Sequence, residues 1–299
     1  MTPPLVTVIM PTFNHAHYLS RSIGSVLAQT LPDWELIVVD NSSTDETIHV
    51  IDAFQDSRIR RIKIENEGVI ARSRNLGIAC SQGKFVAFLD SDDYWYPEKL
   101  STCIRFLQSH ADVVCHGELW VGGSQPVREV FYGPEKHATT RRLLLKGNCL
   151  STSATVAKAD LLRRLGGFSE DPRFVTAEDY ELWIRIAGAG ANISFVSEIL
   201  GEFTRSLESA SSDIPRNTSA VIAVCETHFP SVIGRRLRTL RIRQRRARAW
   251  YGAGRAFTAR HQTRNAWSAF GTTIRLSPFI LRLYPAILIL ALISWRRKA

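Results

Sequence analysis

Two aspartates separated by one residue stand at the end of an apolar stretch. Asp90 and Asp92 flank Ser91 and directly follow the apolar run of residues 85–89. Carboxylates at positions i and i+2 of a turn can face one divalent cation, and Mg²⁺ or Mn²⁺ accept a few carboxylates, waters and substrate phosphates as ligands. An acidic turn that stabilises the N-terminus of a following helix explains the same residues without a ligand. The pair alone leaves both interpretations open.

A second acidic pair, Glu178 and Asp179, opens a predicted helix over residues 177–187. Acids in the first helical turn commonly interact with the helix dipole. A carboxylate at such a position can also take a proton from a substrate hydroxyl as a general base. Trp183, on the same helix, is either a core residue or a side chain that lines the acceptor side of a site.

The first ninety residues alternate strand-like and helix-like patterns, which predicts successive βα units and an α/β fold with a mainly parallel sheet. In an open parallel sheet, ligands bind at the carboxyl ends of the strands, where this chain carries polar residues. Strands are predicted at 7–10, 35–39, 59–64, 85–89 and 113–114, and helices at 18–29, 43–54, 69–80, 97–109, 139–146, 158–165 and 177–187.

Two common phosphate-binding motifs are absent from the sequence. No GxGxxG follows the first predicted strand, which argues against a dinucleotide-binding site. No GxxxxGK[ST] occurs, which argues against a P-loop nucleoside triphosphatase. The first predicted strand is followed instead by the sequence Pro-Thr-Phe-Asn.

Five segments together resemble glycosyltransferase family 2 of the GT-A fold. They are VTVIMPTFN (6–14), WELIVVDNSSTD (34–45), ARSRNLG (71–77), GKFVAFLDSDD (83–93) and EDYELW (178–183). The resemblance covers about residues 5–205. It implies an inverting enzyme that moves a sugar from a nucleotide diphosphate, with UDP favoured, to a saccharide or lipid-linked acceptor hydroxyl. Such enzymes build cell-surface polysaccharides.

The resemblance also implies roles on the donor side of the site. Asp40 would hydrogen-bond the nucleotide base, while Thr12 and Asn14 would line the nucleotide pocket. Arg74 would face the nucleotide side of the cleft. Ser91, within the Asp-Ser-Asp turn, would join the nucleotide-sugar site.

On the reaction side, the resemblance makes Asp92 the more direct ligand of Mn²⁺ or Mg²⁺. Asp90 would lie nearer the ribose or behind the metal's direct ligands. Asp179 matches the catalytic base, and Glu178 would stand beside it on the acceptor side. A single displacement of this kind needs one base and no carboxylate nucleophile.

The net charge of +10 is unevenly distributed. Residues 235–299 contain fifteen Arg and one Lys and no acidic residue, whereas the first 234 residues hold 22 basic and 28 acidic side chains, a net charge of −6. The basic character therefore belongs to the C-terminal part. We expect a catalytic domain over 1–205, a linker or mobile loop over 206–230, and a basic, partly apolar helical tail over 231–299.

The tail is predicted to contain helices at 235–258 and 263–275 and an apolar run at 283–295. Thirteen residues span only ~20 Å as a helix, short of the ~30 Å hydrocarbon core of a bilayer. We therefore expect an interfacial or re-entrant helix on an anionic membrane surface. The alternative is that residues 276–295 dock on the protein's own core.

The cysteine pattern and the N-terminus indicate a cytoplasmic protein, peripheral on the inner face of the membrane. The five cysteines include no CxxC pair, and Met1-Thr-Pro-Pro has no basic region of a secretory signal. Two other function classes stay open: a non-catalytic nucleotide-sugar or membrane-binding module, and a basic nucleic-acid-binding protein. No nucleic-acid motif is present, so no nucleic-acid partner is expected.

Overall fold

A computed structural model describes residues 3–123, 125–206 and 212–296, without the side chains of residues 235, 295 and 296. The chain divides into two compact units. The sheet unit comprises Met1–Leu143, Asn148–Pro172 and Glu178–Leu207, and the helical unit comprises Leu144–Gly147, Arg173–Ala177 and Glu208–Ala299.

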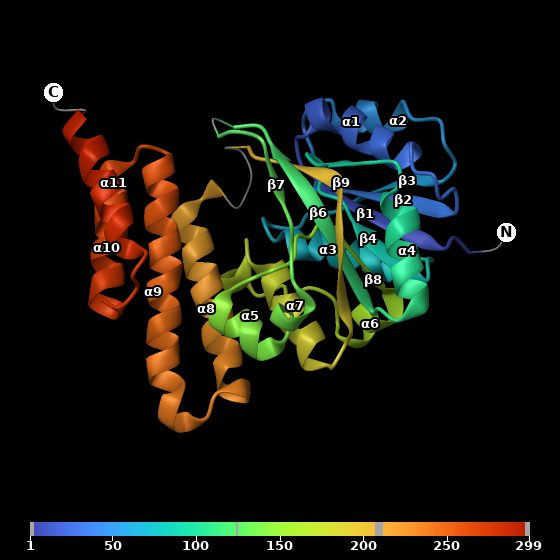
Figure 1. Ribbon diagram of the computed structural model, residues 1–299. Helices are drawn as coiled ribbons and strands as arrows, with labels where there is room; N and C mark the ends of the chain where they lie inside the picture. Colours follow the sequence, from blue (N-terminus) through green and yellow to red (C-terminus); the bar gives the residue numbers. More distant parts are fainter. Residues whose placement is uncertain (1–2, 124, 207–211, 297–299) are drawn as a thin grey trace. The chain divides into compact units, whose positions relative to one another are not determined.

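The strands of the described residues form one sheet in the order β3-β2-β1-β4-β8-β6-β9-β5, with β7 paired to β6 (Figure 1). All seven residues of β1 and of β2 are buried, as expected for strands covered on both faces. The strands are β1 (Val6–Thr12), β2 (Trp34–Asp40), β3 (Ile59–Lys63), β4 (Phe85–Phe88), β5 (Tyr94–Trp95), β6 (Val113–Val121), β7 (Arg128–Val130), β8 (Thr155–Lys158) and β9 (Ile193–Thr204).

The first four strands run parallel, as the sequence predicted. Beyond β4 the sheet is mixed, because β8 pairs antiparallel with both β4 and β6 while β6 and β9 are parallel. The register of β6 against β9 shifts at His116 and Gly117, which interrupts the alternation of side chains. The sequence predicted only residues 113–114 of this half and left 117–136 unresolved.

Helices cover both faces of the sheet (Figure 1). Val8 and Met10 of β1 lie in a core cluster with apolar residues of α1, α2 and α4. The neighbouring residue Ile9 points to the opposite face, where it contacts Gly77 of α3. The helices of this part of the chain are α1 (Ala16–Leu27), α2 (Thr47–Asp52), α3 (Ile70–Cys80), α4 (Lys99–Ser109), α5 (Thr140–Lys146), α6 (Ala159–Arg164) and α7 (Glu178–Gly188), with 3₁₀ turns at Glu135–His137 and Pro172–Phe174.

The helical unit contains four long helices, drawn in orange to red in Figure 1: α8 (Ile214–Val232), α9 (Arg235–Ala259), α10 (Thr263–Leu276) and α11 (Leu283–Arg296). The bounds of α9 and α10 confirm the two predicted helices of the tail. Helix α8 occupies much of the stretch 206–230 for which the sequence predicted a linker or mobile loop. Its N-terminus is capped by Asp213, whose carboxylate accepts from Arg216 N at 3.0 Å. Residues 207–211 of that stretch, and 297–299 of the tail, lie outside the described residues.

The helical unit has its own apolar core between α9, α10 and α11. Leu283 and Leu290 of α11 are buried in that core, whereas Leu288, Ile289 and Leu292 on the same helix are exposed. One face of α11 therefore docks on the protein and the other remains uncovered. None of the helices in the described ranges is both long enough and apolar enough to span a membrane.

Candidate functional site

The carboxyl ends of β1 and β2 place Thr12 and Asp40 side by side as register partners. Both residues are buried. Asp40 Oδ1 accepts from Ser43 N at 3.1 Å, but Asp40 Oδ2 and Thr12 Oγ1 have no hydrogen-bond partner within the described part of the chain. A buried polar atom without a partner costs about 1–3 kcal/mol. These two oxygens therefore fit a ligand with its own donors, such as the base of a nucleotide.

Asn14 fixes the turn after β1 against the turn after β2. Its backbone is left-handed, with φ at 52°, a conformation that Asn tolerates better than most residues. Its N–H donates to Ser43 Oγ at 2.9 Å, and its Oδ1 accepts from Thr44 N at 2.8 Å. Asn14 thus joins the turn that follows Thr12 to the turn that follows Asp40.

The acidic turn, residues 90–93, follows β4 and is held in place by its neighbours. Asp90 N donates to Ser153 Oγ at 3.1 Å. Ser91 is buried, and its Oγ lies 2.7 Å from Nδ1 of His15. The turn therefore contacts both the loop after β1 and the segment before β8. Contact with the loop after β1 is expected where the carboxyl ends of parallel strands converge.

Negative charge accumulates in this turn. Burial, and next the charge of Asp90, raise the pKa of Asp92 to about 7. Burial raises the pKa of Asp93 well above its usual range, although Asp93 Oδ1 accepts from Thr204 N at 2.8 Å. A divalent cation beside Asp90 and Asp92 would relieve this repulsion. Across the described residues, no three His, Cys, Asp or Glu side chains group as metal ligands. Mg²⁺ usually binds through one or two carboxylates and takes its other ligands from substrate phosphates and water.

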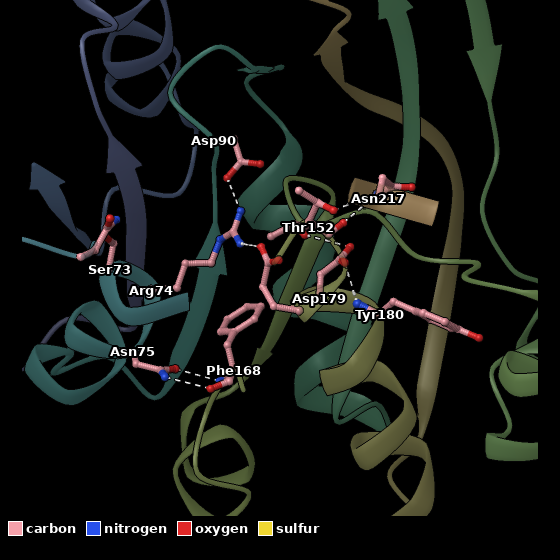
Figure 2. A network of polar contacts seen from close by, with 12 residues as sticks. Ser73, Arg74, Asn75, Asp90, Thr152, Phe168, Asp179, Tyr180 and Asn217 are labelled. Carbon is pink, nitrogen blue, oxygen red and sulfur yellow. Dashed lines mark hydrogen bonds and ion pairs between the residues drawn. The ribbon is translucent and has the colours of Figure 1, made fainter. Parts of the chain in front are cut away.

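Arg74, on α3, bridges the acidic turn and α7 (Figure 2). Its Nη2 donates to Asp90 Oδ1 at 2.8 Å and its Nη1 donates to Glu178 Oε1 at 2.7 Å. The side chain is only 4% exposed, and its guanidinium carbon lies 5.3 Å from the centre of the Phe168 ring. Burial alone would lower the pKa of Arg74, but Asp90 and Glu178 outweigh it and raise the pKa.

Asp179 stands beside Glu178 in the first turn of α7 and points away from Arg74 (Figure 2). Its Oδ2 lies 3.3 Å from both Asn148 Nδ2 and Thr152 Oγ1. Its Oδ1 accepts from Tyr180 N at 2.6 Å. The carboxylate is oriented by three donors and is still partly accessible.

The surroundings of Asp179 make it a stronger base than an ordinary aspartate. Burial, and next the charge of Glu178, raise its pKa to about 6, while the Tyr180 N–H and Arg74 act in the opposite direction. A carboxylate with such a pKa is ionised at neutral pH and still accepts a proton readily. That combination is what general-base catalysis requires.

The two residues predicted with Asp179 on the acceptor side are both buried. Glu178 is engaged by Arg74. Trp183 is fully buried, with its ring centre 6.4 Å from that of Phe168, so the core alternative describes it. Buried residues lie on every side of α7, and Trp183 is one of them.

Four polar residues at the site were not singled out from the sequence as site residues: His15, Asn148, Thr152 and Ser153. His15 follows the first motif directly, so its neighbourhood was detectable. The other three lie in an irregular segment before β8 that has no periodic pattern. Only the folded chain brings this segment to the acidic turn and to Asp179.

Relatives share both the sequence and the fold of the sheet unit. The family model described as "Glycosyl transferase family 2" matches residues 7–163. The UDP-Glc:alpha-D-GlcNAc-diphosphoundecaprenol beta-1,3-glucosyltransferase WfgD of Escherichia coli is 38% identical over 182 residues, which cover 61% of this chain and 69% of WfgD. The putative teichuronic acid biosynthesis glycosyltransferase TuaG of Bacillus subtilis is 30% identical over 204 residues, covering 67% of this chain and 79% of TuaG.

Among solved structures, Staphylococcus aureus TarS 1-349 in complex with UDP-GlcNAc matches with a TM-score of 0.66 at 22% identity. The match covers 98% of this chain and 92% of that one. This likeness supports the same fold, an α/β domain of GT-A type with helices at the C-terminus. The family match spans more than half of the chain and includes Thr12, Asp40, Arg74 and the acidic turn, whereas α7 with Asp179 lies beyond it. The chain belongs to glycosyl transferase family 2 and is a glycosyltransferase.

Proposed function

We propose that this chain is an inverting transferase that moves a sugar from a UDP-sugar to a hydroxyl of a lipid-linked saccharide during synthesis of a cell-surface polysaccharide. The observation that carries the proposal is the bridge of Arg74 between Asp90 and Glu178, which ties the donor-side turn to the helix that bears Asp179. The name of WfgD, which gives UDP-Glc and a diphosphoundecaprenol acceptor, supports the class of donor and acceptor.

On the donor side, the unpartnered oxygens of Thr12 and Asp40 would hydrogen-bond the nucleotide. Asn14 and Ser91 make hydrogen bonds that hold the loops around the proposed nucleotide site. Asp92, with Asp90 behind it, would hold Mn²⁺ or Mg²⁺, which when bound supplies positive charge against the diphosphate. The charge of Asp90 is, after burial, the next cause of the raised pKa of Asp92, and an added cation would offset that repulsion.

On the acceptor side, Asp179 would take the proton from the attacking hydroxyl. Asn148, Thr152 and the Tyr180 N–H hold its carboxylate in one orientation. A single attack from this side, opposite the leaving diphosphate, inverts the configuration at the sugar carbon. No covalent sugar intermediate is needed.

The helical unit would keep the enzyme on the inner face of the cytoplasmic membrane, where a lipid-linked acceptor resides. Six apolar side chains from 279 to 292 are at least 49% exposed. These residues are Phe279, Leu281, Tyr284, Leu288, Ile289 and Leu292. The fifteen arginines of residues 235–299 would attract anionic lipids.

The test is a turnover assay of the full chain with a panel of UDP-, GDP- and dTDP-sugars, read by mass spectrometry. A synthetic GlcNAc-diphosphate lipid serves as acceptor, with Mn²⁺, with Mg²⁺ or with excess chelator. We expect one UDP-sugar to give a product one sugar heavier, and chelator to suppress it. Product formation at full rate in chelator would show that no metal is needed. Turnover with a GDP- or dTDP-sugar, and with none of the UDP-sugars, would show that the donor carries another nucleotide.

A further inference from the structure

A cavity of about 180 Å³ lies within the helical unit, and it belongs to none of the residues assigned above. Its volume is far above the ~10–15 Å³ that a single water molecule needs. The residues that line it are Leu145, Lys146, Arg241, Gln244, Arg245 and Arg248. We call it the arginine cavity.

The geometry of α9 builds one wall of the arginine cavity. Arg241, Arg245 and Arg248 are spaced four and three residues apart, which places them on one face of the helix. Arg245 is 8% exposed, and its Nη2 would lie 3.3 Å from a Cβ at Gly147. Gly147 has φ at 114°, a conformation that favours glycine, so the turn leaves room for the guanidinium.

Local contacts hold two of these arginines in position. Arg248 Nη1 donates to the carbonyl of Leu145. Arg241 Nη1 donates to Gln244 Oε1 at 3.1 Å. Each guanidinium has several further N–H groups, which are arranged in a rigid fork suited to phosphate oxygens.

The lining is strongly positive. It contains three arginines and Lys146, and none of its residues is acidic. Burial, and next the charges of Arg245 and Arg241, lower the pKa of Arg248. Residues 212–296 contain only two acids: Asp213 caps α8, and Glu226 pairs with Arg246. An anion in the cavity would therefore reduce the repulsion between the positively charged side chains that line it.

We propose that the arginine cavity binds a phosphate or diphosphate group through Arg241, Arg248 and Lys146. The group comes either from a lipid that carries it at the membrane surface or from an ion free in solution. Arg245, packed beneath them, contributes its charge. This inference is separate from the proposed reaction at Asp179 and does not depend on it.

The experiment uses the full chain in excess chelator, so that no metal can bridge pyrophosphate to the acidic turn. One arm titrates inorganic phosphate and pyrophosphate by calorimetry. The other measures flotation with phosphatidylglycerol vesicles against phosphatidylcholine vesicles. The test variant is Arg241→Gln with Arg248→Gln. The matched control is Arg255→Gln with Arg264→Gln, which removes the same charge at two exposed positions outside the cavity.

We expect the test variant to bind at least about tenfold more weakly than the control in one arm. A loss in the titration identifies a free anion, and a loss with phosphatidylglycerol alone identifies a lipid phosphate. Equal binding by the two variants in both arms would overturn the proposal, because only overall charge would then matter. Donor turnover by the test variant reports on the proposed function separately, and an unchanged melting temperature shows that it folds.

Discussion

The role proposed for Asp179 places two opposing demands on a single side chain. A general base must lose its proton near neutral pH, yet hold enough affinity to take one from a hydroxyl. Burial and Glu178 raise its pKa, while the Tyr180 N–H and Arg74 limit the rise. The sequence singled out this aspartate through the EDYELW segment, which also contains Tyr180, but the other two donors, Asn148 and Thr152, lie in a segment that no motif marks.

We expect Asp179→Asn to lower kcat by about 10²–10⁴-fold, the usual contribution of a general base. The substitution keeps the size of the side chain, so binding of UDP, measured by calorimetry, should change little. Glu170→Gln, which neutralises a more exposed acid of the sheet unit, is the control and should keep its activity. Full turnover by Asp179→Asn would show that another group takes the proton.

The same substitution should stabilise the fold. The folded pKa of Asp179, about 6, lies above its ordinary value of 3.8, so stability falls as pH rises between these values. At pH 8 the charged form is fully present, and Asp179→Asn removes a penalty on the order of 1–3 kcal/mol. Denaturant unfolding at pH 8 and at pH 4 measures this: the gain should vanish at pH 4, and a variant less stable at pH 8 would contradict it.

The pH dependence of turnover follows from the same pKa. Because the base acts in its ionised form, kcat should rise with pH and then level off, with a midpoint no higher than about 6, since a cation bound with the donor offsets the charge of Asp90. A profile from pH 5 to 8 at saturating donor and acceptor gives the midpoint. A rate that falls over this range would mean that an acid, not a base, controls the reaction.

Arg74 is predicted to matter for folding as much as for the site. Arg74→Met breaks the ion pair between Arg74 and the buried Glu178, and breaking such a pair by removing one partner typically costs about 3–5 kcal/mol. Adding Glu178→Gln removes the buried negative charge and should recover part of the loss. Unfolding of the wild type, both single variants and the double variant gives the coupling between them, and simple additivity would show that the bridge contributes nothing.

Among the elements, helix α3 is the one that places Arg74, and it lies unusually close to β1. A Cβ at Gly77 would lie 2.5 Å from Cγ2 of Ile9, a fully buried strand residue that cannot easily move. Gly77 thus permits the contact that sets the depth of α3 against the sheet.

Gly77→Ala should destabilise the fold by about 1–3 kcal/mol through overpacking. Gly24→Ala, in α1, is the control, because a Cβ there meets nothing within 4 Å and alanine favours helix. It should be neutral or stabilising. Thermal unfolding compares the two, and equal effects would mean that α3 can shift outward freely.

Prediction from the sequence worked best for the elements with strong local patterns. The four parallel strands, α9 and α10 have clear apolar runs or helical spacing, and their ends were placed within a few residues. The strands β5, β7 and β8 were missed because they are short, and β9 was missed although it is long, because its pairing with β6 passes through register shifts. Helix α8 was missed because its Ser- and Pro-rich start read as a loop, although Asp213 and Pro215 form a favourable helix start.

At the scale of the whole molecule, charge and apolar exposure are both concentrated in the helical unit. The apolar run was expected either to lie on a membrane or to dock on the protein. Helix α11 buries Leu283 and Leu290 yet leaves Leu288 and Leu292 uncovered. The sequence could not divide these faces, because nearly every residue of the run is apolar.

We expect the full chain to sediment with anionic vesicles and to dissociate as salt rises. Phe279→Ser with Leu281→Ser should weaken this binding by at least about tenfold, since each side chain is more than 80% exposed and free to enter the lipid. Val127→Ser with Phe131→Ser, exposed apolar residues of the sheet unit, is the matched control. Tighter binding to duplex DNA than to vesicles would favour a nucleic-acid partner instead.

The Arg74 bridge joins Asp90, on the donor side, to the helix that bears Asp179, and the charge of Asp90 also affects the ionisation of Asp179. The negative charge of Asp90 raises the pKa of Asp179. Cancelling that charge, by Asp90→Asn or by a cation that arrives with the donor, therefore lowers the pKa of Asp179 and ionises it more fully. For a base at Asp179, arrival of the donor and its cation would thus extend the pH range of the ionised form toward acid. The same change would lower the proton affinity of the carboxylate, so donor binding would exchange base strength for turnover at lower pH.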